Sequence, residues 1–147
     1  MTAMTPAMAP ARAGVLYTPE ILAAATGLAG FPLADDLPLR ADARSRSCGS
    51  SIAMGLALDS QGCVARIGLR PHACAVGQAA AFVFARAAPG RSRADLAAAR
   101  DGIAAWLDGS DDAPDWPGIA LLEPVRGYPA RHAAVLLAWD AALAAMP

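Results

Sequence analysis

The chain has 147 residues, of which 56% are hydrophobic, and a formal net charge of −1 at pH 7. This length is typical of a single domain with one core, and the combination of many apolar residues with a low net charge argues against a disordered chain. The twelve basic residues, all arginine, are interspersed with thirteen acidic residues and no apolar run is long, so we expect neither a nucleic-acid partner nor a membrane span, which needs ~18 apolar residues.

The first features along the chain are a tail and a helix. Residues 1–14 are rich in Met, Ala and Pro, and we expect a flexible tail there, followed by one domain over residues 15–147. The segment 18–20 (Thr-Pro-Glu) predicts a helix start, because it supplies an N-cap, a proline at the first helical position and an acidic residue in the first turn. We expect this helix to end near Gly27.

Three segments then show the period of two that is typical of strands. They span residues 37–44, 52–58 and 63–70, and in the first and third of them arginines alternate with apolar residues. Residues 59–62 have the turn sequence Asp-Ser-Gln-Gly, so the second and third strands should form a hairpin.

At Pro71 strand pairing should be interrupted, and the pattern then becomes helical. We expect helices over residues 73–88, from a capping box at 92–95 onward, and over 129–146, with a long connection at 108–127. Strands followed by helices indicate an α+β fold, in which helices cover one face of a small antiparallel sheet.

The three cysteines are Cys48, Cys63 and Cys74. An odd number argues against a disulfide scaffold, and reduced thiols are typical of the cytoplasm, where we expect this protein. If Leu58 and Cys63 flank the hairpin turn, Cys48 falls opposite Ala73, so Cys48 and Cys74 should meet at the open end of the hairpin. Cys63 would then lie in mid-strand on the apolar face, as a small core residue.

Cys74 also stands at the predicted start of a helix, and Arg46 and Arg70 lie near it in sequence. Both features stabilise a thiolate. A cysteine-nucleophile enzyme that pairs Cys74 with His72 would need a third, orienting group and an oxyanion site. No motif marks either group, so we do not expect an enzyme.

Three blocks of sequence resemble the signature blocks of the NifU/IscU/SufU-type iron–sulfur cluster assembly scaffolds. They are Cys-Gly-Ser at 48–50, Ala-Cys-Ala-Val-Gly-Gln-Ala at 73–79, and a helix start, Tyr-Pro-Ala-Arg-His, within 128–139. The blocks occur in the family's order, and the first two have the family's spacing. The resemblance implies a SufE/NifU-like fold, which is a three-stranded antiparallel sheet packed by helices.

The resemblance also implies a function and its partners. Clusters would be assembled on Cys48 and Cys74, with sulfur from a cysteine desulfurase and in contact with other iron–sulfur assembly proteins. A transient iron–sulfur cluster is the expected cofactor. Zinc would take its place in the Gram-positive branch of the family, which the last block resembles most.

The chain departs from the family pattern at two ligand positions. Ser50 stands where the family has a metal-ligating Asp, and Ala134 stands where it has a third cysteine. Ala133 also replaces the His or Lys that usually precedes that cysteine. Structural zinc takes four N, S or O ligands, so two thiolates would leave such a site incomplete.

Three further side chains are candidates for auxiliary roles. His72 and His132 could each supply a ligand, although a lone histidine at a helix start is more often a capping or surface residue. Arg131 matches the family's arginine and could stabilise anionic sulfur; a surface ion pair is the alternative.

Two functions therefore remain open. In the first, the chain is a scaffold or sulfur acceptor, and a homodimer in which each chain gives Cys48 and Cys74 would supply the four thiolates of a [2Fe–2S] centre. In the second, it is a degenerate binding module that docks on a cysteine desulfurase or a cluster carrier and holds no metal. The substitutions at Ser50 and Ala134 motivate the second function.

Overall fold

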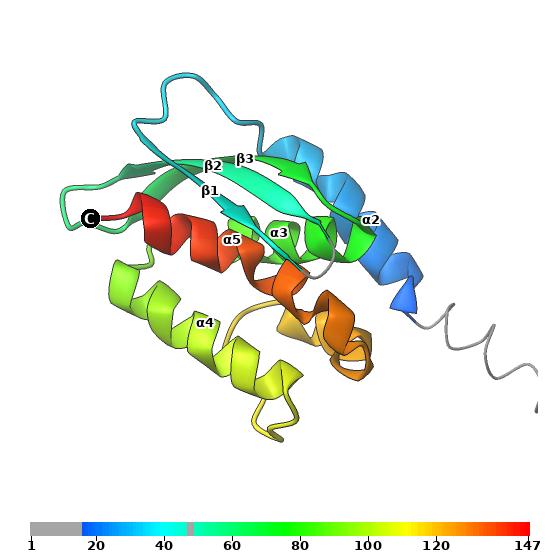
Figure 1. The fold of residues 1–147 in the computed structure, drawn as a ribbon. Helices are drawn as coiled ribbons and strands as arrows, with labels where there is room; N and C mark the ends of the chain where they lie inside the picture. The colour runs from blue at the N-terminus through cyan, green and yellow to red at the C-terminus, as the bar shows by residue number, and fades with distance from the viewer. Residues whose placement is uncertain (1–15, 47–48) are drawn as a thin grey trace, which may run out of the picture.

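The computed structural model describes residues 16–46 and 49–147. In chain order its helices and strands are α2 (Pro19–Gly27), η1 (Leu28–Gly30), β1 (Leu39–Arg44), β2 (Ser51–Leu58), β3 (Val64–His72), α3 (Ala75–Ala87), α4 (Arg93–Leu107), η2 (Ile119–Gly127), η3 (Pro129–Arg131) and α5 (His132–Ala145), where η marks 3-10 helices. The strands form one antiparallel sheet in the order β1-β2-β3, and α3, α4 and α5 lie on one side of it (Figure 1). The predicted α+β class is confirmed, whereas the predicted tail, residues 1–14, lies outside the described residues.

Two helices begin at the caps that the sequence predicts. At α2 the hydroxyl of Thr18 accepts a hydrogen bond of 3.1 Å from the N–H of Ile21. At α4 the hydroxyl of Ser92 accepts from the N–H of Asp95 at 3.1 Å, and the Asp95 carboxylate accepts from the N–H of Ser92 at 3.0 Å. Each cap satisfies backbone donors that the first helical turn cannot pair internally.

The hairpin between β2 and β3 differs from the predicted register by two residues. Met54 lies opposite Leu69, and a bulge at the turn places Leu58 opposite Val64, so the predicted pairing of Leu58 with Cys63 is wrong. A shift of two residues leaves every side chain on its predicted face, because strand side chains alternate with a period of two. The bulge breaks this alternation at the turn, where Val64 is 1% exposed.

The turn itself explains the shift. The Asp59 carboxylate accepts hydrogen bonds from the N–H groups of Gln61 and Cys63, and the Asp59 N–H donates to the Cys63 carbonyl at 2.8 Å. Cys63 therefore belongs to the turn and is half-buried, and the prediction that it lies in mid-strand as a core residue is wrong.

Pro71 lies within β3, opposite Ile52, and the strand pairing continues past it. The prediction that Pro71 interrupts the pairing is therefore wrong. The N–H of Leu69 points away from β2, since it donates to the carbonyl of Phe31 at 2.9 Å. Pro71 is two residues further along the strand, so its nitrogen faces the same outer edge and no hydrogen bond of the ladder is lost. The hairpin consequently continues to the pair Ser51–His72.

The core lies between the sheet and the helices. The helix α5 packs against β1, β2 and α3, and many of the buried positions of α3 and α5 are alanines, which let the two helices approach closely. Three large aromatic side chains pack against one another beside α3 and α5. The ring of Phe84 stacks on Trp116 at a centroid distance of 5.7 Å and meets the edge of Trp139 at 5.1 Å.

A loop covers part of the opposite face of the sheet. Leu33 and Leu37, which follow η1, lie over Gly55 and Gly68, and a Cβ atom built on Gly68 would sit 2.9 Å from the Cα of Leu33 and closer still to the carbonyl oxygen of Pro32. The loop can approach the sheet this closely only because both strand positions lack a side chain.

We expect Gly68→Ala to destabilise the fold by about 1–3 kcal/mol, because the new methyl group meets backbone atoms that cannot move independently. Urea unfolding followed by circular dichroism measures the change, with Gly30→Ala as the control, since an added Cβ at Gly30 meets nothing within 4 Å. Equal losses in the two variants would show that the loop adjusts freely.

The capping box of α4 should make stability depend on acid pH. The hydrogen bonds from Ser92 hold the pKa of Asp95 below its ordinary value. A carboxyl group with a lowered pKa in the folded state stabilises the fold above its unfolded-state pKa, and this stabilisation is lost as the pH falls through the folded-state value.

Asp95→Ala should therefore lower stability at neutral pH, and its difference from the original chain should shrink on acidification below about pH 4. Urea unfolding across pH measures this, with Asp111→Ala, in the exposed connection after α4, as the matched control. A difference that is independent of pH would contradict the assignment of this stabilisation to the ionised carboxylate.

Candidate functional site: a cysteine at the start of α3

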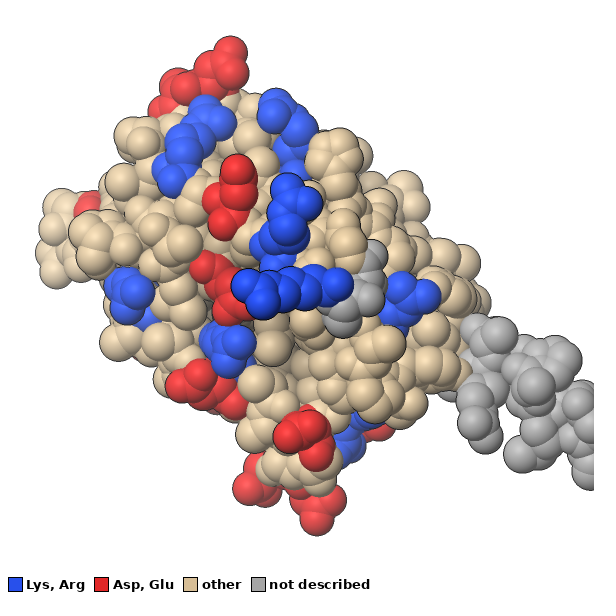
Figure 2. Space-filling view, in the orientation of Figure 1, with Lys and Arg blue, Asp and Glu red and all other residues tan. Residues whose placement is uncertain are grey.

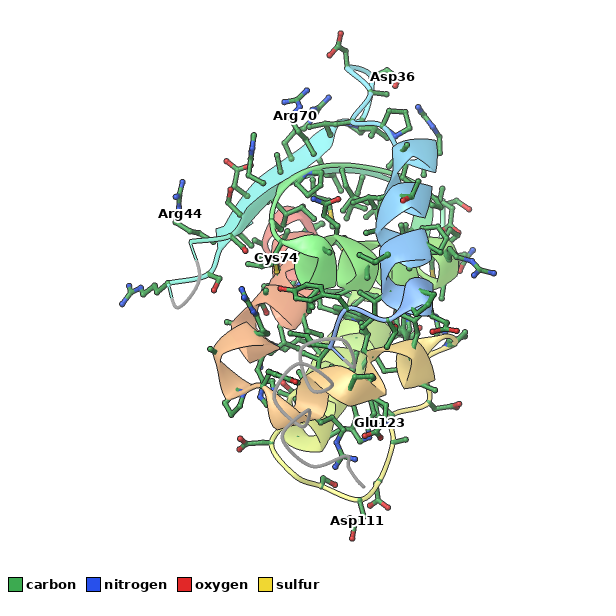
Figure 3. The ribbon with its side chains drawn as sticks, turned by 90° about the vertical axis from the view of Figure 1, so that its right-hand side faces the viewer. Asp36, Arg44, Arg70, Cys74, Asp111 and Glu123 are labelled. Carbon is green, nitrogen blue, oxygen red and sulfur yellow. The ribbon has the colours of Figure 1, made fainter. Side chains whose placement is uncertain are left out.

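Cys74 occupies the point where β3 leads into α3. It is the N-cap residue of α3, its backbone is extended, and its side chain makes no capping hydrogen bond. The residue is half-buried, and Figure 3 shows it at the first turn of α3. The thiol thus lies at a helix N-terminus, where unpaired N–H groups and the helix dipole favour an anionic ligand.

Hydrogen bonds hold the backbone around Cys74 in place. The carbonyl of Cys74 accepts from the N–H of Gln78 at 3.0 Å, and the side-chain amide of Gln78 donates to the carbonyl of Ala73 at 2.8 Å. Gln78, which belongs to the second signature block, therefore fixes the chain on both sides of the thiol.

Ala134, the position at which the resemblance implies a third cysteine, lies beside this helix start. A Cβ atom built on Gly77 would be 3.6 Å from the Cβ of Ala134 and 2.8 Å from the Cβ of Ala73. Ala134 is on α5 and is 1% exposed. The first turn of α3 and the start of α5 therefore meet where the resemblance implies a shared site, with a methyl group in place of the sulfur.

Cys48 lies outside the described residues, so its predicted meeting with Cys74 stays a prediction. The residues on either side of it are described. The N–H of Ser45 donates to the carbonyl of Ser50 at 2.7 Å, and Ser51 is opposite His72. The connection between β1 and β2 is thus at the end of the sheet where β3 leads into Cys74.

The auxiliary candidates separate into different environments. Ser50 is 4% exposed, directly before β2. His72 is exposed and lines a hollow of the sheet surface, across Ser51 from Arg44, and no hydrogen bond joins it to Cys74 within the described chain. A Cys74–His72 pair of the kind that a nucleophilic enzyme uses is therefore not formed.

His132 has a structural role. Its Nε2 atom lies 3.1 Å from the carbonyl oxygen of Val125 and 3.2 Å from that of Arg126. Because both partners are acceptors, Nε2 carries a proton and donates, and it ties η2 to the start of α5. Arg131, the last residue of η3, is half-buried and makes no ion pair with the carboxylates of the described residues.

Metal binding by one chain is limited by this arrangement. Within residues 16–46 and 49–147, no group of three or more His, Cys, Asp or Glu side chains is placed to hold a metal ion. Among the described residues, Cys74 supplies a thiol to the site, and the methyl side chain of Ala134 has no atom that could bind a metal. A four-ligand centre would need Cys48 and donors from outside this set.

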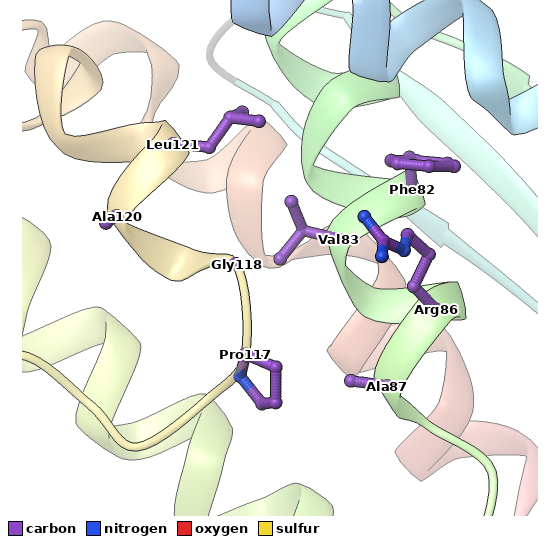
Figure 4. A pocket seen from close by; sticks show the side chains of 8 residues that line it. All are labelled: Phe82, Val83, Arg86, Ala87, Pro117, Gly118, Ala120 and Leu121. Carbon is purple, nitrogen blue, oxygen red and sulfur yellow. The ribbon is translucent and has the colours of Figure 1, made fainter.

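Two surface hollows were not predicted from the sequence. One, of about 390 Å³, lies between α3 and the first residues of η2 with the segment just before it. It is lined by Phe82, Val83, Arg86, Ala87, Pro117, Gly118, Ala120 and Leu121 (Figure 4). The other lies on the open face of the sheet, around Arg44 and Arg70. The alternation of charged residues in β1 was a signal for the hollow on the sheet. The hollow at α3 joins segments whose proximity no sequence pattern indicated.

Comparison with known proteins assigns the chain to a family. No model of a known protein family and no curated protein sequence matches it. In the structure itself, none of the helices in the described part is long and apolar enough to cross a membrane. Solved structures do match. A nitrogen-fixing NifU-like protein (N-terminal) from Brucella abortus is 32% identical, with a TM-score of 0.82, over 91% of this chain and 94% of that one.

A second structure has the same fold at lower sequence identity. It is a protein from Fervidobacterium islandicum AW-1 assigned as an iron–sulfur cluster assembly scaffold for the SUF system, which is 18% identical with a TM-score of 0.79 over 91% of this chain and 98% of that one. The signature blocks, the sheet with its helices on one side, and the identity to the Brucella protein lead to one conclusion: this chain belongs to the NifU-like family.

Proposed function

We propose that this chain acts in cytoplasmic iron–sulfur cluster assembly, as a scaffold or sulfur-accepting protein that uses Cys74 together with Cys48. The observation that supports this best is the placement of Cys74 at the N-cap of α3, half-buried and beside the start of α5. Membership of the NifU-like family supports the same role, and such a role is that of a scaffold and not of an enzyme.

The chemistry suits transfer of sulfur from a cysteine desulfurase that carries a persulfide. The Cys74 thiolate would attack the outer sulfur of that persulfide, the sulfur–sulfur bond would break, and the desulfurase thiolate would leave. Cys74 would then carry the persulfide, with no net oxidation or reduction. The helix N-terminus stabilises the attacking anion.

Cluster binding would need more than one chain. Iron–sulfur clusters are usually held by four cysteine thiolates, and the described residues of one chain offer Cys74, to which the proposal adds Cys48. Two chains would complete the set in a homodimer. One chain would also supply too few ligands for zinc, since structural zinc sites take four ligands as well.

A second function is supported by the substitutions at the site. Ala134 is buried and cannot ligate, and the Nε2 of His132 is committed to two backbone carbonyls. In this alternative the chain is a binding module that docks on the desulfurase or on a cluster carrier without holding metal.

Cys74→Ser distinguishes the two functions. Under the first, the variant should lose the iron and sulfide bound after anaerobic reconstitution, because oxygen is a poorer ligand than a thiolate for this metal centre. Iron and sulfide analysis with the visible spectrum measures this, and Cys63→Ser, in the hairpin turn, is the matched control. Equal, negligible iron in the original chain, Cys74→Ser and Cys63→Ser would favour the binding module.

Ala134→Cys should increase cluster or metal retention, because it places a thiol beside the start of α3. Ala133→Cys, on the same helix but exposed, is the matched control. Iron and sulfide per chain are measured after reconstitution of both. If Ala134→Cys retains no more than Ala133→Cys, then the start of α3 is not the metal site.

A further inference from the structure

The open end of the outer sheet face carries a polar hollow of about 480 Å³. We call it the arginine trough and define it by Arg44 of β1, Arg70 and His72 of β3, and Ser51 and Ala53 of β2, all of which line it. It lies on the face of the sheet opposite to the helices, and Figure 3 shows Arg44 and Arg70 pointing away from α3. Cys74 and Ala134 do not line it, whereas His72, an auxiliary candidate of the cysteine site, does.

Strand register gives the trough its shape. In one row across the three strands, Ser51 of β2 lies between Arg44 of β1 and His72 of β3. In the next row, Ala53 lies between Asp42 of β1 and Arg70 of β3. The central strand thus contributes small side chains to the floor, and the outer strands contribute long side chains to the walls. Because neighbouring strands are about 4.8 Å apart, the walls are separated by roughly 10 Å at the backbone.

A loop lies beyond one end of the trough. The loop that carries Leu33 and Leu37 crosses the same face of the sheet at Gly55 and Gly68. A ligand therefore enters from the opposite end, where the connection between β1 and β2 begins and β3 ends. Access to the trough and access to Cys74 are at the same end of the sheet but on its two faces.

The trough has a small excess of positive charge. Arg66 forms an ion pair of 2.8 Å with Asp36, whereas no described carboxylate pairs with Arg44 or Arg70. The carboxylate of Asp42 also lines the trough. Figure 2 shows basic side chains gathered, with acidic ones between them, over the region where the sheet lies in Figure 1.

The Arg40 side chain adds a fixed charge beside the trough. It donates to the carbonyl oxygens of Leu37 and Ala34, and its charge also acts on the nearby carboxylate of Asp36, whose pKa it helps to lower. Among the residues that line the trough, Arg44 and Arg70 outnumber Asp42.

We propose that the arginine trough binds a short, extended acidic segment of a partner protein. In an extended chain, the side chains on one face recur about every 6.8 Å, which is the spacing of Arg40, Asp42 and Arg44 along β1. The floor of small residues leaves room for such a chain between the walls. Asp42 interrupts the cations, which disfavours a uniform phosphate backbone and favours a segment of mixed but mainly negative charge.

This inference goes beyond the proposed function and does not depend on the cysteines. The probe is a fluorescein-labelled peptide of alternating Glu and Ala residues in which one central Glu is replaced by Lys to face Asp42. Its binding to the full chain is followed by fluorescence anisotropy at about 50 mM salt, where screening is weak. The double variant Arg44→Gln/Arg70→Gln should raise the dissociation constant roughly tenfold, as expected for two lost ion pairs. Cys74→Ser should leave binding unchanged even if it abolishes iron binding.

The matched control is Arg86→Gln/Arg93→Gln, which removes the same net charge from exposed positions of α3 and α4. It should change the dissociation constant less than twofold. A second pair of variants tests the floor and guards against misfolding: Ala53→Glu should abolish binding by repulsion, whereas Ala53→Gln, of the same size, should weaken it far less.

Amide chemical-shift changes on addition of the peptide should be concentrated at Ser51 and Ala53. Failure of the peptide to bind, equal loss in both double variants, or shifts confined to other surfaces would overturn the proposal. So would tighter, arginine-dependent binding of a single-stranded RNA of equal length, which would identify a nucleic acid as the ligand.

Discussion

The pairing of β2 with β3 is the interaction on which the functional regions depend. It continues through Pro71 to the pair Ser51–His72, and this sets where β3 stops and where Cys74 can begin α3. It also aligns the small residues of β2 with the long side chains of β3, which forms the floor and one wall of the arginine trough. A hairpin that ended at Pro71 would leave both features without a defined position.

Local signals in the sequence predicted most of the fold. Caps at Thr18 and Ser92 work through neighbouring backbone groups, so their effect can be deduced from a few residues. The register of the hairpin was less accessible, because the Asp59 carboxylate binds two turn N–H groups and a bulge follows. A shift of two residues leaves each side chain on the same face of the sheet, so the alternation of apolar and polar residues could not reveal the shift.

The candidate site was predicted in part. The placement of Cys74 at a helix N-terminus followed from the helical pattern after Pro71, and the resemblance located Ala134 as the position of the absent thiol. The partners of His132 are backbone carbonyls of η2, a 3-10 segment that no periodicity predicted, so its structural role could not be foreseen. The trough depends on which residues share a sheet face across three strands, and that requires the observed register.

The outer edge of β3 has a consequence for self-association. At Leu69 the edge already carries a bridge to the segment at Pro32, and at Pro71 it has no N–H to offer. A second chain therefore finds no continuous row of donors along β3 on which to add a strand. Any homodimer that extends the sheet from chain to chain must pair along β1 instead, next to the arginines of that strand.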